Sequence, residues 1–171
     1  MDLSRVYSGQ PLIPRGTSGA FDSIGAAAAA EVVTWQGQHW VFYLGCRAHH
    51  EELDKTPEAC AIGVATYPLD RLSCLRGSGV IEMKPFELRG TALWLNLKTE
   101  PNGYIATEVL DTAGRVIPGF SRQECEPATG DHSSHRATWR AASLARLVGT
   151  TVVVRLHLRG AALCAMRFEA A

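Results

Sequence analysis

The sequence predicts an all-β protein. Apolar residues recur with a period of two over most of the chain, and such alternation places them on one face of a strand. Turn-forming glycine and aspartate residues follow several of these segments. Helical propensity is confined to the alanine run 26–30, which continues into β-branched residues and is expected to be extended, and to residues 141–147, expected to form at most one or two turns.

The expected strands follow from this alternation. Residues 32–35 and 40–44 are predicted to form a hairpin through Gln36-Gly37-Gln38. Residues 93–97 and 103–110 alternate in the same way, and the second segment runs into a turn at Asp111–Gly114. In the last two expected strands the shared faces are formed by Val152, Val154, Leu156 and Leu158, and by Ala162, Cys164, Met166 and Phe168.

Glycine and serine at 76–79 mark the best boundary between two strand-rich halves, residues 1–76 and 77–171. The predicted core of the second half contains Leu93, Leu95, Ile105, Val109, Trp139, Val152, Val154, Leu156 and Phe168.

Composition narrows the function classes. The 171 residues carry 17 Lys+Arg and 17 Asp+Glu without a basic cluster, so we expect neither a nucleic-acid nor a membrane partner. The N-terminal residues lack the layout of a signal peptide, so the sequence does not predict export. There is no GxSxG, phosphate-binding or dinucleotide-binding motif, and we expect no cofactor.

The five cysteines are widely spread and form no CxxC pair. An odd number excludes complete pairing, and the spacing does not favour a structural zinc site. We expect mostly buried free thiols, a pattern that favours a reducing compartment.

Several segments together resemble a known family. In the first half these are Pro14-Arg15-Gly16, Gly19–Ser23, Trp40–Arg47, His50-Glu51 and Ala61–Ala65. They resemble the last blade of the five-bladed β-propeller glycoside hydrolases, the invertase and arabinanase-like group. The β-sandwich that follows the propeller is resembled by segments of the second half, namely Gly90–Asn96, Gly103–Asp111, Gly114–Ser121, Cys125, Gly130-Asp131, Trp139, Leu147–Gly149 and Val152–Phe168.

The resemblance implies a blade-like antiparallel sheet packed on a C-terminal, jelly-roll-like antiparallel β-sandwich. The chain also departs from this family, because it has room for only one of the five blades. A glycosidase needs two carboxylates at a defined separation, and in the family they come largely from the blades that are missing here. We therefore expect a truncated, glycoside-hydrolase-like protein that binds carbohydrate rather than hydrolysing it, and we assign no catalytic residue.

The candidate substrate-binding residues are Asp22, Arg47, His50 and Glu51. Asp22 follows glycine and lies, by the resemblance, near the mouth of the funnel, where its carboxylate could accept hydrogen bonds from a sugar. The simpler role for Asp22 is to bind backbone amides in a turn. His49, His50, Glu51 and Glu52 are metal-binding residue types, but consecutive residues do not converge on one ion in a regular strand, and a solvated polar loop explains them equally.

Residues of the second half have alternative roles of the same kind. Asp111 and Asp131 could contribute to a calcium site, although a turn explains Asp111. Trp94, Tyr104 and Trp139 could stack against a sugar or belong to the core.

The second hypothesis is a non-catalytic interaction module. An isolated blade has an apolar face that its neighbours would otherwise cover, so we expect a homodimer joined through residues 32–67. The competing expectation is that residues 1–15 fold back over this face and leave a monomer.

Overall fold

The computed structural model describes residues 11–53 and 56–170, and in them the protein is all-β. The strands form antiparallel sheets, and the described residues contain short 3-10 turns but no α-helix. The predicted fold class is thus confirmed. The chain divides into two compact units, Met1–Leu72 and Ser73–Ala171, which we call the N-terminal and C-terminal units.

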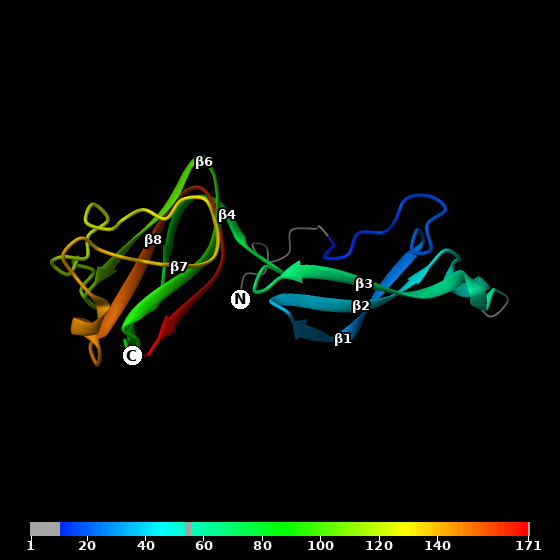
Figure 1. The fold of residues 1–171 in the computed structure, drawn as a ribbon, viewed down its shortest axis with the longest axis horizontal. Coiled ribbons are helices and arrows are strands. Elements are labelled where there is room, and N and C mark those ends of the chain that lie inside the picture. Colours follow the sequence, from blue (N-terminus) through cyan, green and yellow to red (C-terminus); the bar gives the residue numbers. More distant parts are fainter. Residues whose placement is uncertain (1–10, 54–55, 171) are drawn as a thin grey trace. The chain divides into compact units, whose positions relative to one another are not determined.

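The N-terminal unit contains an antiparallel sheet in the order β1-β2-β3 (Figure 1). Its strands are β1 (Gly25–Trp35), β2 (Gln38–Cys46) and β3 (Cys60–Pro68), and the segment before β3 contains the 3-10 turns η1 (His50–Glu52) and η2 (Pro57–Ala59). The expected hairpin is present, and the alanine run is extended within β1. Gln36 and Gly37 both have positive φ, 51° and 71°, as the two-residue turn that matches strand twist requires.

One side of this sheet is closed by the segment 11–24. Val41 on β2 is only 2% exposed. A Cβ on Gly45 would lie 2.4 Å from the ring of Phe21, so glycine allows this segment to approach the strand closely. The Tyr43 hydroxyl donates a hydrogen bond to Asp22, and the Tyr67 hydroxyl donates one to the Leu12 carbonyl.

The C-terminal unit has a second antiparallel sheet. Its strands are β4 (Leu75–Glu82), β5 (Phe86–Glu87), β6 (Ala92–Leu110), β7 (Asp131–Arg136) and β8 (Thr151–Glu169). Their order is β4-β8-β6-β7, and β5 also pairs with β8. The two segments expected at 93–97 and 103–110 are parts of the single strand β6, and the turn expected at 111–114 follows it.

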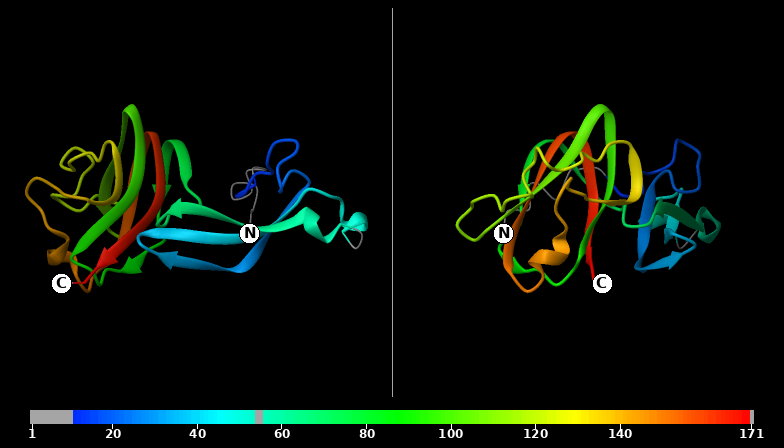
Figure 2. Two further views of the ribbon diagram at one scale, coloured as in Figure 1. Left: turned by 45° about the vertical axis from the view of Figure 1, so that its right-hand side comes forward. Right: turned by 60° about the vertical axis from the view of Figure 1, so that its left-hand side comes forward.

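Strands β6 and β8 bend together, which gives this sheet two layers. Their register shifts between Thr99 and Tyr104. A Cβ on Gly103 would lie 2.2 Å from the Gly160 carbonyl oxygen, so a larger residue would prevent this approach. Figures 1 and 2 show both strands arching over. The two halves of each strand therefore cover a common core, as the layers of a sandwich do.

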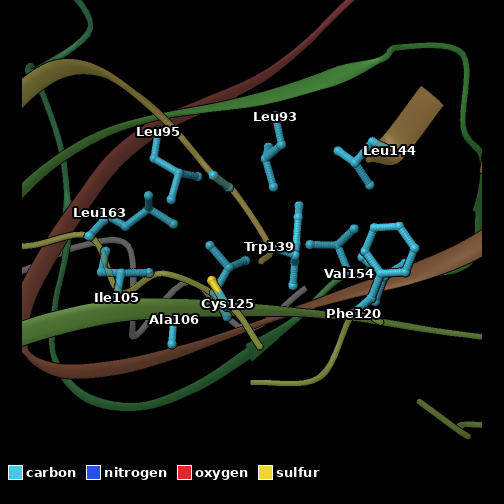
Figure 3. Close-up of a cluster of buried hydrophobic side chains, with 14 of the residues drawn as sticks. Leu93, Leu95, Ile105, Ala106, Phe120, Cys125, Trp139, Leu144, Val154 and Leu163 are labelled. Carbon is cyan, nitrogen blue, oxygen red and sulfur yellow. The ribbon is translucent and has the colours of Figure 1, made fainter. Parts of the chain in front are cut away.

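The core lies inside this bent sheet and is completed by the segment 111–150 (Figure 3). Of the predicted core residues, all but Phe168 are buried, and Phe168 is partly buried against the others. Trp139 packs edge-on against Phe120 with 5.1 Å between ring centroids. The 3-10 turn η3 (Leu144–Leu147) adds Leu144 and Leu147, where at most one or two turns were expected.

A β-bulge at Cys164 corrects the sequence prediction for the end of β8. Leu97 pairs with Leu163, whereas Asn96 pairs with Ala165, so Cys164 has no direct partner on β6. Simple alternation placed Cys164 on one face with Ala162 and Phe168. Because the bulge inserts one residue, Leu163 enters the core instead, with 7% exposure.

The expectation of free thiols is wrong for two of the cysteines. Cys164 forms a disulfide with Cys74, which precedes β4. Leu75 and Leu163 are directly paired, so the bond joins positions that the strand register already brings together. Cys46, Cys60 and Cys125 are free, and of these Cys125 is buried.

Candidate functional site

Asp22 is enclosed rather than open to solvent. It is 7% exposed, and the Tyr43 hydroxyl donates a 2.8 Å hydrogen bond to its Oδ2 atom. This bond to a carboxylate raises the pKa of Tyr43 above its ordinary value, with smaller contributions from burial and from the Asp22 charge. The structure therefore gives Asp22 a role in fastening the segment before β1 onto β2.

Two glycines make this enclosure possible. A Cβ at Gly16 would lie 2.1 Å from Asp22 Oδ1, and a Cβ at Gly45 would lie 2.7 Å from Asp22 Cβ. Backbone thus approaches the carboxyl group on one side and the base of the side chain on the other. Little room is left for a sugar hydroxyl beside either oxygen.

Arg47, His50 and Glu51 lie on the loop between β2 and β3 and are all exposed. The backbone of this loop is held by hydrogen bonds from Arg47 N to Ala59 O, at 2.9 Å, and from Leu53 N to His50 O, at 3.3 Å. Among the described residues, no hydrogen bond or ion pair joins these side chains to Asp22. The sequence-predicted residues thus separate into one enclosed carboxylate and a polar loop.

The alternative metal-binding roles of these side chains have little support in the geometry. In the part of the chain that the structure describes, no three His, Cys, Asp or Glu side chains are grouped as a metal ion would require. Asp111 Oδ1 accepts hydrogen bonds from the backbone of Ala113 and Arg115, both 2.9 Å, and its Oδ2 pairs with the Arg115 side chain. Asp131 forms an ion pair with Lys98 at 3.2 Å.

The candidate sugar-stacking aromatics are also engaged within the protein. Trp139 is buried, and its indole nitrogen donates a 3.1 Å hydrogen bond to the Thr107 carbonyl. The guanidinium group of Arg167 lies 5.6 Å from the ring centre of Trp94, and that of Arg122 lies 5.6 Å from the ring centre of Tyr104. One face of each of these two rings is therefore already occupied.

A charged cluster that the sequence analysis missed crosses three strands of the C-terminal sheet. Arg155 on β8 is paired in register with Glu82 on β4 and Glu108 on β6. Its guanidinium contacts Glu82 at 2.7 Å and Glu108 at 2.9 Å, and His157 Nε2 lies 2.9 Å from the same Glu108 oxygen. Arg155 and His157 were visible as the polar positions of β8, but their partner on β6 depends on register.

Glu108 is the most buried member of this cluster, with a side-chain exposure of 8%. Burial by itself would raise its pKa, but hydrogen bonds and charges from His157 and Arg155 outweigh this effect and lower the pKa of Glu108. Arg155 on β8 contacts Glu82 on β4 as well as Glu108 on β6, so the cluster joins β4, β8 and β6. We interpret it as a stabilising network.

The most unusual surface of the N-terminal unit is apolar. The register places Phe42 opposite Val64 and Leu44 opposite Ile62 on the side of the sheet that the segment 11–24 does not cover. These four side chains are between 42% and 79% exposed. By alternation, Val33 and Trp35 on β1 share this side, and they are 48% and 57% exposed. We call these six residues the open face.

Comparisons with protein-family models, with curated proteins and with solved structures find no match for this chain. No helix among the described residues is long and apolar enough to cross a membrane.

Proposed function

We propose that the sheet of the N-terminal unit is an assembly module, through which two copies of the chain pair by their open faces. The observation that carries this proposal is the exposure of six large apolar side chains on one side of a single sheet. Contiguous apolar surface of this kind on a folded protein usually marks an interaction site. The resemblance to a propeller blade supports the same proposal, because a blade normally packs both of its faces against neighbours.

A second copy is the partner that fits this surface best. The six side chains that define the open face are all uncharged, so these residues of two copies can meet without like charges opposing each other. The net charge of +0 adds no long-range repulsion between copies. In a twofold dimer the same patch serves both subunits, and twofold dimers are the commonest soluble oligomers.

The size of the open face sets the expected strength of the dimer. The sheet is three strands wide, and its central strand β2 has nine residues. At about 3.3 Å per residue and about 4.8 Å per strand, one side of the sheet has an area of roughly 400 Å² per subunit. Two such faces fall below the roughly 1,200 Å² of a standard stable interface. We therefore expect a reversible dimer that forms at micromolar concentration rather than an obligate one.

The test is a charge placed at the centre of the open face. Ile62→Lys is expected to shift the full-length chain to the monomer, because burying an unpaired ammonium group against a second apolar face is strongly unfavourable. Sedimentation velocity over a concentration series measures the change.

The matched control is Val80→Lys on β4, which replaces another exposed β-branched side chain, 58% exposed, in the C-terminal unit. It should leave the dimer unchanged. Equal dissociation in both variants, or none in Ile62→Lys, would place the interface elsewhere.

We propose carbohydrate binding by the loop between β2 and β3 as a second candidate function. Its support is the exposure of Arg47, His50 and Glu51 on this one loop, together with the resemblance to a propeller blade. Planar guanidinium and carboxylate groups are suited to bind the paired hydroxyls of a sugar. A glycan array probed with the chain and with Arg47→Ala tests this, since a loop contact requires the variant to lose the signal.

Hydrolysis of ordinary glycosides is not part of this proposal. Asp22 and Glu51 are the carboxylates among the predicted substrate-binding residues, and Asp22 is enclosed while Glu51 is exposed. An assay with sucrose, fructan, arabinan and an aryl glycoside is expected to show no turnover. Turnover that Asp22→Asn abolishes without unfolding the chain would contradict this.

A further inference from the structure

Two free thiols face each other at the end of the N-terminal sheet. Cys46 is the last residue of β2 and Cys60 is the first residue of β3, and the two are directly paired. Their sulfur atoms are 3.0 Å apart, and one thiol donates a hydrogen bond to the other. This hydrogen bond raises the pKa of the Cys46 thiol above its ordinary value.

The ladder of hydrogen bonds shows which kind of cross-strand pair this is. Arg47 N donates to Ala59 O at 2.9 Å, one residue beyond Cys46 and one before Cys60. In an antiparallel pair this bond flanks a non-hydrogen-bonded position, where Cα atoms are about 4.5 Å apart and side chains are closest. That spacing lies within the roughly 4.4–6.8 Å that a disulfide spans. The backbone is therefore already suited to a bond between these sulfurs.

The pair is also placed where a small reagent can reach it in the monomer, whose open face is uncovered. Both cysteines are half-buried, and by alternation they share a side of the sheet with Leu44 and Ile62, which are 44% and 79% exposed. The remaining free thiol, Cys125, differs from this pair in its exposure and in its hydrogen-bond partner. It is 4% exposed and donates toward its neighbour's carbonyl, Glu126 O.

We propose that Cys46 and Cys60 form a redox site, which closes to an intramolecular disulfide by exchange with a low-molecular-weight disulfide such as oxidised glutathione. One cysteine loses its proton and attacks the reagent, forming a mixed disulfide and releasing one reagent thiolate. The second cysteine, also deprotonated, attacks the protein-bound sulfur and releases the other thiolate. The protein is oxidised by two electrons, the reagent is reduced to two thiols, and these take up the two protons.

Closure would join the ends of the loop that carries Arg47, His50 and Glu51. Residues 47–59 would become part of a covalent ring, and the ends of β2 and β3 could no longer separate. Because a cross-link chiefly restricts the unfolded chain, oxidation should stabilise the N-terminal unit. This effect does not depend on assembly through the open face.

Peptide mapping of the intact chain tests the proposal. The folded protein is equilibrated with oxidised glutathione, alkylated, and digested with trypsin without reduction. The expected product is a cross-link between the peptides 16–47 and 56–71, which contain Cys46 and Cys60 and are separated by the peptide 48–55. Reduced glutathione in excess should reverse it, and the thermal midpoint of the N-terminal unit should rise by roughly 5–15 °C on oxidation.

Single-cysteine variants provide a second readout. Cys60→Ser should retain a stable glutathione adduct on Cys46, because the thiol that would displace it is absent. The matched control Cys125→Ser should still form the 16–47 to 56–71 cross-link. The proposal is overturned if both thiols of the wild-type chain stay alkylatable after oxidation, or if Cys46 and Cys60 form only bonds between chains.

Discussion

The two units treat the same alternating pattern in different ways. In the C-terminal unit, β6 and β8 bend over so that both halves of the sheet cover one core, and eight of the residues predicted to be inside are buried. In the N-terminal unit, the segment 11–24 closes one side of the sheet and the other side remains open. Alternation therefore specifies which side chains share a face, but not whether a second layer covers that face.

The two units also differ in whether their cross-strand cysteines are bonded to each other. Cys74 and Cys164 are joined at a β-bulge beside a directly paired leucine pair. Cys46 and Cys60 are directly paired across β2 and β3 but remain thiols. The N-terminal unit thus carries both an uncovered face and an unclosed thiol pair, whereas the C-terminal unit has neither in its described residues.

Truncating one leucine or isoleucine in each unit should produce the largest difference in stability between the two units. Leu156→Ala removes a completely buried side chain of the C-terminal core and should lower the free energy of unfolding by about 2–4 kcal/mol. Ile62→Ala removes a side chain that is 79% exposed and should change it by less than about 0.5 kcal/mol in the dilute monomer. Urea denaturation at low protein concentration measures both, and equal losses would show that the open face is covered within the monomer.

The next largest effect concerns the charged cluster. Glu108→Gln removes the carboxylate that Arg155 and His157 share, and it should cost about 1–3 kcal/mol at neutral pH. The figure is lower than for a fully buried pair because Arg155 is 29% exposed and retains Glu82. Glu87→Gln, which changes an exposed carboxylate paired with Arg89, is the control and should cost less than about 0.5 kcal/mol.

The pH dependence of this effect has a definite sign. The pKa of Glu108 is lowered in the folded protein, so its ionised form contributes stability that is complete above the unfolded-state value of about 4.3. The contribution is lost as the pH falls through the lower, folded-state pKa. The difference in stability between wild type and Glu108→Gln should therefore shrink between about pH 5 and pH 2. A difference that grows between pH 5 and pH 2 would contradict the cluster as described.

A smaller effect is expected at Asp22. Tyr43→Phe removes the hydrogen bond to an enclosed carboxylate and should destabilise the N-terminal unit by about 1 kcal/mol. Hydrogen exchange at residues 20–24 should accelerate, because this bond fastens the segment onto β2. Tyr67→Phe loses an exposed hydrogen bond to the Leu12 carbonyl and serves as the control, with a smaller change expected.

Much of the fold was predictable because it depends on local pattern. The Gln36-Gly37 hairpin follows from turn chemistry, and the burial of Val152, Val154 and Leu156 follows from alternation. The extended alanine run also follows from local context, since it continues into β-branched residues. These features need no knowledge of which strands are neighbours.

The remaining features depend on pairing between distant residues. The bulge at Cys164 exists because of its register against β6, and it reverses the expected faces of Ala162 and Leu163. The role of Arg155 changes in the same way. From alternation it is a solvent-facing residue whose loss should cost far less than that of Val154, but its contacts with Glu82 and Glu108 raise the cost expected for Arg155→Ala.

The candidate site was predictable only as a set of residues. The sequence indicated Asp22, Arg47, His50 and Glu51, but two close glycine approaches and the Tyr43 hydroxyl decide that Asp22 is enclosed. Residues 1–10, which belong to the segment expected to compete for the open face, lie outside the described residues. Within that segment, the Leu12 carbonyl accepts a hydrogen bond from Tyr67, and the Arg15 side chain donates one to the Ile24 carbonyl.

The central claim is that the open face is covered by a second copy of the chain, and the mass of the intact protein in solution tests it most directly. Static light scattering should be measured over a concentration series that spans the micromolar range. We predict a weight-average mass that rises with concentration from the chain mass of 18.5 kDa toward twice that value. A mass that stays at 18.5 kDa throughout the series would contradict the claim.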